Sequence, residues 1–370
     1  MPFCLSRCTY CDFNTYLLDP ALCAAYLEAL GREIAAWARA PEVAGRPVET
    51  IFVGGGTPSL LAPAAMASLL ERCRRAFPVE AEAEVTIEAN PGTVDPARLR
   101  GYRAAGVNRL SFGVQSFEDR LLRAIGRLHS AGDVGRAFRQ AREAGCDNVN
   151  LDLMFGLPGQ AATDWERTLD QALALGPEHL SVYGLTLEEG TQMTALVRAG
   201  RVILPDEEAQ AAMYERSLAR LAAAGYEQYE VSNFARPGRQ CRHNLCYWEG
   251  GDYLGLGAGS HSHLDGRRFH NHLHPRRYAA EVAARGTAVA GEERLETPAR
   301  VGEAFMLGLR LRDGVDLAAL EARYGAAPVR SRASALDAFA AAGLVERRGS
   351  RVRLTDRGLL LANEVLAAVL

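Results

Sequence analysis

Three cysteines near the start of the chain have the spacing that most clearly suggests chemistry. Cys4, Cys8 and Cys11 form a C-x3-C-x2-C pattern, so one loop can direct three thiols toward one point. Three thiolates suit an iron–sulfur cluster or zinc. Structural zinc would need a fourth ligand such as Asp12, because the other cysteines are scattered singly. Zinc and ordinary core cysteines are the alternatives to a 4Fe-4S cluster, which on three cysteines would leave one iron open to a small molecule.

The elements that would position these thiols follow a repeating pattern. Between residues 19 and 190, short apolar runs alternate with amphipathic stretches, which is typical of parallel βαβ units. We expect helices that begin at Pro20 and near Pro63, Asp95, Asp133 and Asp164. The expected strands are Thr50–Val53, Glu84–Glu88, Val107–Val114, Val149–Met154 and His179–Leu185. In such folds ligands bind at the carboxyl ends of the strands.

Glycines and polar residues follow these expected strands. The first strand leads into Gly54-Gly55-Gly56-Thr57-Pro58-Ser59, where glycines let the backbone approach a ligand closely. Glu88, Gln115 and Asp152 lie at the ends of the next three expected strands. A tight turn alone would explain the glycines, and each polar residue taken singly could be a solvated loop or helix-cap residue.

Taken together, these motifs resemble the radical S-adenosylmethionine superfamily, including the aromatic Tyr10 before the third cysteine. The resemblance implies that the free iron binds S-adenosylmethionine and that reduction yields a 5'-deoxyadenosyl radical. The strand-end motifs resemble the branch related to oxygen-independent coproporphyrinogen III oxidase, over nearly the whole chain. By this resemblance, the residues that bind S-adenosylmethionine are Tyr10, Gly55, Gly56, Thr57, Glu88, Gln115, Arg127, Asp152 and Thr186. Arg127 could instead form an ion pair on a helix surface.

Two features distinguish members of that branch. The true oxidases look like C-x3-C-x2-C-x-C, whereas Phe13 stands at the last position here. The run His243-Asn-Leu-Cys-Tyr-Trp248 is similar to the HNxxYW signature of the HemW branch, whose members are regarded as heme-binding chaperones. The resemblance therefore favours a protein that binds heme or a porphyrin and passes heme to an acceptor protein. Coproporphyrinogen III oxidase is the alternative, so whether the protein is an enzyme stays open.

The second motif also has a physical interpretation of its own. An imidazole such as that of His243 can ligate heme iron, while Tyr247 and Trp248 offer flat apolar area for the macrocycle. Cys246 is a further candidate iron ligand. Alternatively the motif holds a lid over the barrel, with His243 hydrogen-bonded and Trp248 in the core. The nearby histidines have irregular spacing and are expected to be surface or loop residues: His261, His263, His270, His272 and His274.

The chain divides into three expected parts. Residues 1–225 should form a partial (β/α)6 barrel, residues 226–291 a glycine-, histidine- and aromatic-rich elaboration over its mouth, and residues 292–370 a small winged-helix-like α+β domain. In the last part we expect helices at 317–324, 331–342 and from 356, around a hairpin at 344–354. Family members usually carry a strand before the cysteine loop. We therefore expect the first barrel strand to be missing and the native start to lie upstream of Met1.

Composition excludes several classes of protein. The 370 residues carry a net charge of -3 and are 48% hydrophobic, which argues against disorder and against coating of nucleic acid or an anionic membrane. No signal-like start or apolar run of about 18 residues is present, so a cytoplasmic, non-spanning protein is expected. A DNA-binding sensor would use the basic hairpin, yet it would not need the strand-end residues. The arginines of this basic hairpin region are Arg347, Arg348, Arg351, Arg353 and Arg357. Reduction of the cluster would need an electron donor such as a flavodoxin or ferredoxin.

Overall fold

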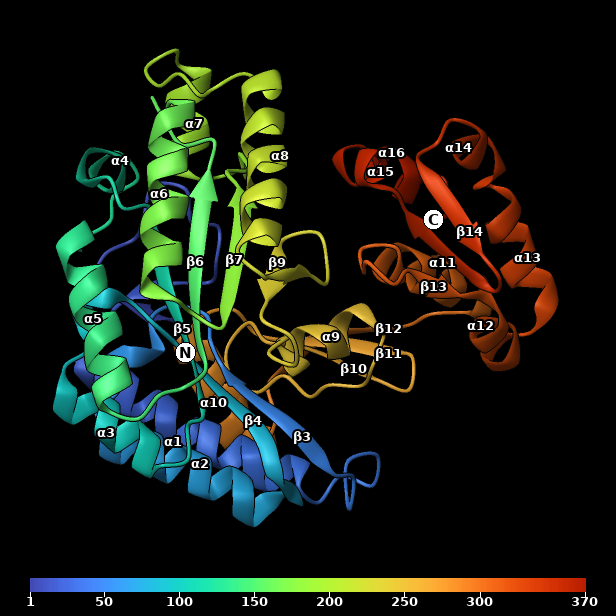
Figure 1. Cartoon of the computed structure of the whole chain (residues 1–370). Helices are drawn as coiled ribbons and strands as arrows, with labels where there is room; N and C mark the ends of the chain where they lie inside the picture. The colour runs from blue at the N-terminus through green and yellow to red at the C-terminus, as the bar shows by residue number, and fades with distance from the viewer.

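A curled half-barrel sheet forms the centre of the computed structural model, which describes all 370 residues. Its seven strands run in the order β3-β4-β5-β6-β7-β9-β8 (Figure 1). The first five are parallel and confirm the predicted strands. They are β3 (Val48–Val53), β4 (Val79–Ala89), β5 (Arg109–Gln115), β6 (Val149–Phe155) and β7 (His179–Gly184).

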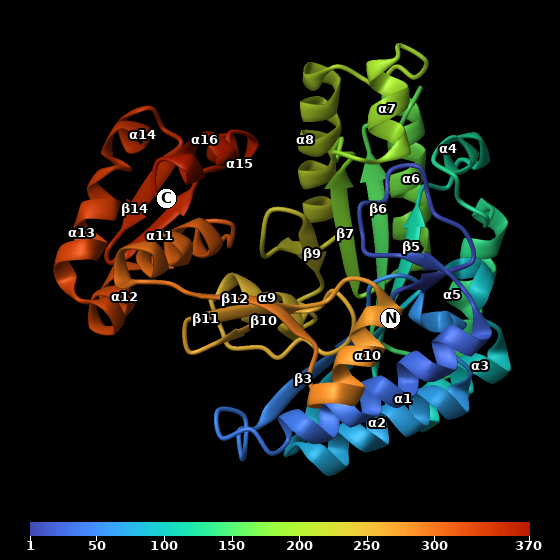
Figure 2. The ribbon, with the colours of Figure 1, turned by 180° about the vertical axis from the view of Figure 1, so that it is seen from behind.

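Helices cover the outer face of this sheet, as the alternation of βα units requires. Asp19 caps α1, since its Oδ1 accepts the N–H of Ala21 at 2.9 Å, and Pro20 is the first helical residue as predicted. Figure 2 shows α1, α2 and α10 side by side along the bottom of the molecule. The helices between strands are α1 (Pro20–Trp37), α2 (Pro63–Ala76), α3 (Pro96–Ala104), α4 (Asp119–Ala124), α5 (Ala131–Glu143), α6 (Ala162–Leu175), α7 (Gln192–Arg198) and α8 (Glu207–Ala223).

The sheet is wider than the six strands expected. β9 (Asn233–Ala235) pairs antiparallel with β7, and β8 (Glu227–Gln228) pairs with β9. Both strands fall in the segment that was expected only to cover the barrel mouth, and both are too short to show an alternating pattern in the sequence. β3 is the edge strand. The short strand β1 (Phe3–Cys4) pairs instead with β2 (Tyr16–Leu17), and the N–H of Thr57 donates to the carbonyl of Phe3 at 2.8 Å.

The rest of the middle segment closes the open side of the half-barrel. The helix α9 (Arg242–Trp248) lies against β3. The Glu84 carboxylate of β4 caps its N-terminus, accepting the N–H of Arg242 at 3.1 Å and that of His243 at 3.2 Å. Residues Gly255 to Gly259 form a loop, as predicted. A three-stranded sheet and one helix complete the segment: β10 (His261–Leu264), β11 (Arg267–Asn271), α10 (Pro275–Arg285) and β12 (Val289–Arg294).

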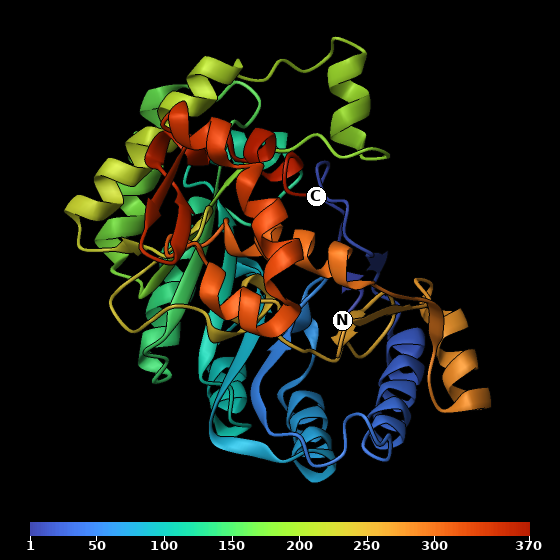
Figure 3. The same cartoon turned by 90° about the vertical axis from the view of Figure 1, so that its right-hand side faces the viewer.

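The C-terminal domain has its own hydrophobic core and the winged-helix order of helices and hairpin that was expected (Figure 3). The predicted helix over 331–342 is wrong, because the chain bends between α13 and α14 where the Leu336 side chain is fully buried. The elements are α11 (Thr297–Gly308), β13 (Val315–Asp316), α12 (Leu317–Tyr324), α13 (Ala326–Ser334), α14 (Asp337–Ala341), β14 (Val345–Arg348), β15 (Arg351–Leu354), α15 (Asp356–Leu360) and α16 (Ala362–Ala367).

Two backbone hydrogen bonds join this domain to the edge of the barrel. The N–H of Val231 donates to Arg310 O at 3.1 Å, and the N–H of Arg312 donates to Tyr229 O at 3.0 Å. The segment after β8 and the segment after α11 therefore run antiparallel across the domain boundary. No helix of the protein combines the length and the apolar character needed to cross a membrane.

A fully buried carboxylate on α1 holds the middle segment in place. Glu33 accepts hydrogen bonds from Gly257 N at 2.7 Å, Tyr278 Oη at 2.6 Å and Asn271 Nδ2 at 2.6 Å. Burial raises the pKa of this carboxyl, and the three donors oppose the rise. The loop it fixes also supports the cysteine loop, because Asn14 Nδ2 donates to Ala258 O at 3.3 Å.

Replacing Glu33 by Ala should destabilise the protein strongly. The variant leaves three buried donors without an acceptor, each costing about 1–3 kcal/mol, so we expect a loss of roughly 3 kcal/mol or more in the free energy of unfolding. Urea denaturation followed by circular dichroism measures it. Glu28→Ala, on the same helix but with a side chain 67% exposed, is the control and should cost little. Equal stability of the two variants would contradict the role of Glu33.

Candidate cluster and cofactor site

A cavity of about 150 Å³ lies at the carboxyl ends of the parallel strands. The structure brings to it nearly all the residues predicted to hold the cluster and S-adenosylmethionine, and only Thr186 lies elsewhere, exposed after β7. The members in the cavity are Cys4, Cys8, Cys11, Tyr10, Gly55, Gly56, Thr57, Glu88, Gln115, Arg127 and Asp152. Residues far apart in the sequence therefore meet because parallel strands end at one edge.

The three thiols of the cavity are free and hydrogen-bonded by neighbours. Thr57 Oγ1 donates to Cys4 Sγ at 3.3 Å, and Arg127 Nη1 donates to Cys8 Sγ at 3.6 Å. Burial raises the pKa of the Cys4 and Cys11 thiols, so a bound cation is needed to hold them as thiolates. No group of three or more His, Cys, Asp or Glu side chains is placed here to hold a single metal ion. That arrangement fits a cluster, in which each thiolate binds a different iron, better than zinc.

The glycine loop after β3 is close to both the cysteine loop and Glu88. A Cβ at Gly56 would lie 2.7 Å from the carbonyl oxygen of Phe3, and Gly55 has φ +113°. Any larger residue at 56 would push the cysteine loop away. The N–H of Gly55 donates to Glu88 Oε2 at 2.9 Å, so this loop also orients the carboxylate.

Gln115 is a strained residue that points a free amide oxygen into the site. The register of β5 against β6 shifts between Gly113 and Gln115, and Gln115 has φ +67°. Its Oε1 is buried and has no hydrogen-bond partner. Such a backbone costs about 1–3 kcal/mol and is concentrated at functional sites, as are bulges that redirect a side chain. The unpaired oxygen is therefore available to a ligand's donor.

Two carboxylates share the floor of the cavity. Burial, together with repulsion from Asp152, raises the pKa of Glu88 to about 7. Burial also raises the pKa of Asp152, against hydrogen bonds that include one from Asn150 Nδ2 at 2.7 Å. A cationic ligand such as S-adenosylmethionine would favour the ionised forms of both groups.

Arg127 belongs to the cavity, so the alternative of a helix-surface ion pair is wrong. Its Nη2 donates to Asn90 Oδ1 at 2.5 Å and to the carbonyl of Gly113. Asn90 and Ser111 also line the cavity and were not predicted. Strand alternation could have found Asn90, because it lies two residues after Glu88 and hence on the same face of the chain.

A row of polar side chains leads from this cavity into the barrel. Asn150 Nδ2 donates to Asp152 Oδ1, while Asn150 Oδ1 lies 2.6 Å from His179 Nδ1. The other ring nitrogen of His179 lies 2.8 Å from Tyr229 Oη. Burial, with Arg109 nearby, holds the pKa of His179 well below its usual value. The row is therefore uncharged between Asp152 and Tyr229.

The structure brings together only two of the three predicted heme residues, His243 and Tyr247, and Trp248 lies apart from them. His243 lies in the barrel, with Nδ1 2.7 Å from Thr50 Oγ1 and Nε2 2.7 Å from Tyr247 Oη, stacked on Phe52. Burial lowers its pKa to about 4. Trp248 faces the opposite way, into a pocket against the C-terminal domain, with the Arg310 guanidinium 5.5 Å from its ring centroid. The alternative that His243 is a hydrogen-bonded residue of a lid over the barrel therefore agrees with its observed contacts.

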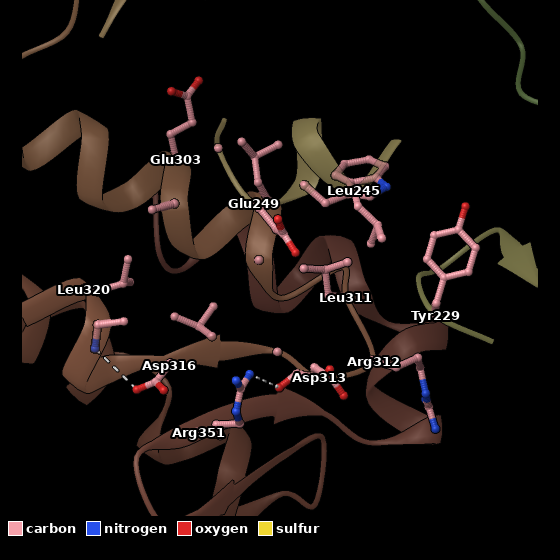
Figure 4. Close-up of a pocket in the computed structure, with 18 of the residues that line it drawn as sticks. Tyr229, Leu245, Glu249, Glu303, Leu311, Arg312, Asp313, Asp316, Leu320 and Arg351 are labelled. Atoms are coloured by element: carbon pink, nitrogen blue, oxygen red, sulfur yellow. Dashed lines mark hydrogen bonds between the residues drawn. The ribbon is translucent and has the colours of Figure 1, made fainter. Parts of the chain in front are cut away.

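That second pocket has a volume of about 570 Å³ and lies between the two domains (Figure 4). Tyr229 and α9 form one wall, and α11, α12 and the Leu311–Asp316 segment form the other. Of the five clustered histidines only His263 lines it. His261 and His270 stack on each other at 5.4 Å as surface residues, as expected.

The basic hairpin is partly neutralised within its own domain. Arg347 pairs with Asp337 at 2.6 Å, and Arg353 and Arg348 pair with Glu346 at 2.5 Å and 3.2 Å. These two carboxylates reduce the positive charge that the hairpin could offer to phosphates.

Comparison with known proteins identifies the family of the chain. Residues 1–172 match the model of the radical SAM superfamily, and residues 295–361 match the HemN C-terminal domain. The chain is 43% identical to the heme chaperone HemW of Mycobacterium tuberculosis, covering 100% of this chain and 93% of that protein. It is 40% identical to the heme chaperone HemW of Bacillus subtilis, covering 100% and 97%.

A solved structure gives the same result for the fold. The coproporphyrinogen III oxidase HemN of Escherichia coli, a radical SAM enzyme, superposes with a TM-score of 0.86 at 27% identity, covering 100% of this chain and 88% of that one. A 4Fe-4S cluster and S-adenosylmethionine are the cofactors of this superfamily, and the cavity offers the thiols and the polar groups that they need. Its sequence, its fold and the residues of its cavity place the chain in the HemW family of the radical S-adenosylmethionine superfamily.

Proposed function

We propose that this protein is a heme chaperone, which binds heme and transfers it to an acceptor apoprotein. The observation that carries the proposal is the similarity to HemW heme chaperones over the whole chain, at 43% and 40% identity. Local residues support it. Phe13 occupies the position of the fourth cysteine of the oxidases, and it is 58% exposed at the rim of the cluster cavity.

Within this function, Cys4, Cys8 and Cys11 would hold the cluster. When bound, the cluster can supply an electron to S-adenosylmethionine at its open iron. The chain's own residues would orient that ligand. Glu88 and the Gln115 oxygen would accept hydrogen bonds from the ligand, and Arg127 donates to Cys8 Sγ. Tyr10, Gly55, Gly56 and Thr57 shape the walls, and Asp152 closes the floor. Thr186 is exposed and does not line this cavity.

The acceptor protein and an electron donor such as a flavodoxin or ferredoxin are the partners this function requires. A cytoplasmic setting fits the eight free cysteines.

Coproporphyrinogen III oxidase is the second candidate, because HemN shares the fold over the whole chain. One anaerobic experiment separates the two. Reconstituted protein is given S-adenosylmethionine, reductant and coproporphyrinogen III, and products are resolved by chromatography. We expect no decarboxylated product. In parallel, the same preparation is loaded with hemin and mixed with an apo-heme protein, whose absorbance should report transfer. Decarboxylation without transfer would overturn the proposal.

Loss of any of the three cavity thiols should prevent cluster binding. Cys4→Ala, Cys8→Ala and Cys11→Ala each remove one of the ligands that bind separate irons, so iron and sulfide after reconstitution should fall to background. Cys246→Ala is the matched control, because this partly buried thiol lies on α9 outside the cavity. It should retain a full cluster. If instead the Cys246 variant lost its iron and the others kept it, the ligand assignment would be wrong.

The affinity for S-adenosylmethionine should rise with pH through the titration of Glu88. With its pKa at about 7, this group is mostly protonated below that pH and mostly ionised above it. The cationic ligand binds the ionised form, so the affinity should increase roughly eightfold between about pH 6 and about pH 7.5. Anaerobic calorimetry measures the change. Glu88→Gln should bind more weakly and lose the dependence, and a variant that kept the full dependence would assign it to another group.

A further inference from the structure

The interdomain pocket contains a histidine whose second ring nitrogen is not used by the protein. His263 lies on β10, and its backbone is fixed by reciprocal hydrogen bonds with Tyr253 at 2.8 Å and 3.0 Å. Its Nδ1 lies 3.0 Å from the carbonyl oxygen of Gly251. A carbonyl can only accept, so Nδ1 carries the proton and the neutral ring keeps its lone pair on Nε2. Histidines that ligate metals are commonly oriented in this way.

The position of this histidine is rigid. The His263 side chain is only 13% exposed, and Nδ1 also lies 3.5 Å from Asp252 Oδ1. The same hairpin docks on the C-terminal domain through an ion pair between Arg268 and Glu303 of α11. His263 is therefore held at the pocket by both domains, whereas both ring nitrogens of His243 are already bonded.

The remaining lining suits a large flat ligand with acidic groups. Trp248 and Tyr229 supply aromatic surface. Leu245, Leu311 and Leu320 supply apolar surface (Figure 4). Two arginines of the pocket, Arg300 of α11 and Arg323 of α12, have their guanidinium carbons 5.4 Å and 5.1 Å from the ring centroid of Tyr324, and neither forms an ion pair. Their guanidinium groups are thus free to pair with two carboxylates of a ligand.

Two of the acidic residues that line the pocket already have hydrogen-bond or ion-pair partners within the protein. Glu303 pairs with Arg268, and Asp316 accepts the N–H of Ala318 at 3.0 Å at the start of α12. Glu227, Glu249 and Asp313 carry no ion pair. The other two lining arginines are also engaged, since Arg312 pairs with Asp356 at 2.6 Å and Arg351 donates to the Asp313 carbonyl at 3.4 Å. Arg300 and Arg323 are therefore the two lining cations left to pair with the carboxylates of a ligand, against three lining carboxylates that carry no ion pair.

We propose that the interdomain pocket is the heme site, with His263 Nε2 as the iron ligand, Trp248 against the macrocycle, and Arg300 and Arg323 on the two propionates. This proposal rests on the proposed function. The pocket volume of about 570 Å³ lies within the usual 300–1,000 Å³ range of cofactor and small-molecule sites. A single protein ligand would hold the iron less firmly than two, which suits a cargo that must be released.

The test is a hemin titration followed by the Soret absorbance, with metal-free protoporphyrin IX as a second probe. His263→Gly should weaken hemin binding at least ~10-fold and alter the Soret band, because the iron loses its ligand. Protoporphyrin binding should be nearly unchanged in this variant, since it uses the rings and the arginines only. Added imidazole should restore the Soret band of hemin. Trp248→Ala should weaken both probes.

Matched variants make the outcomes distinguishable. His261→Gly, on the same strand but exposed and stacked on His270, is the control and should behave as the unmodified protein. If the unmodified protein binds no hemin, the proposed function itself fails. If it binds hemin and His263→Gly does so equally, with the loss appearing in His243→Gly, the proposed function stands and the pocket assignment is overturned.

Discussion

The architecture depends on the need to satisfy polar groups inside a half-open barrel. The inward-facing positions of the strands include Glu84, Arg109 and His179, all less than 10% exposed. Buried polar and charged groups are costly unless they are paired. The middle segment meets that need, because α9 places its N-terminus on the Glu84 carboxylate and Tyr229 reaches the His179 ring. The segment after residue 225 thus supplies hydrogen-bond partners to the polar side chains inside the barrel, and without it the lumen would be open to solvent.

The same polar lumen joins the two cavities. One end of the row is Asp152, in the floor of the cluster cavity, and the other is Tyr229, in the wall of the interdomain pocket. The backbone of Tyr229 is also bonded to Arg312, so this residue belongs both to the domain junction and to the end of the row. A continuous row of hydrogen bonds therefore runs from Asp152 in the cluster cavity to a residue that lines the interdomain pocket.

Part of the cluster cavity could be placed from the sequence, because strand ends are visible as apolar runs that stop. Glu88, Gln115 and Asp152 were found as polar residues at such ends, and their role in binding S-adenosylmethionine came from the resemblance to the family. The row behind them was not found, since alternation tells which residues share a face but not that the inner face of this barrel is polar. The strands β8 and β9 were missed because two or three residues show no period. The pocket at Trp248 joins segments more than fifty residues apart and leaves no local pattern.

The two cavities differ in size. The cluster cavity has a volume of about 150 Å³, and the interdomain pocket, at about 570 Å³, lies within the usual range of cofactor and small-molecule sites. Of the two, the interdomain pocket is the one with more room for a macrocycle. Two contacts hold the cysteine loop in place. Gly56 packs closely against the backbone of Phe3, and Asn14 Nδ2 donates to the carbonyl of Ala258 in the loop that Glu33 supports. The scaffold thus keeps its redox centre compact and leaves the larger site to the junction with the C-terminal domain.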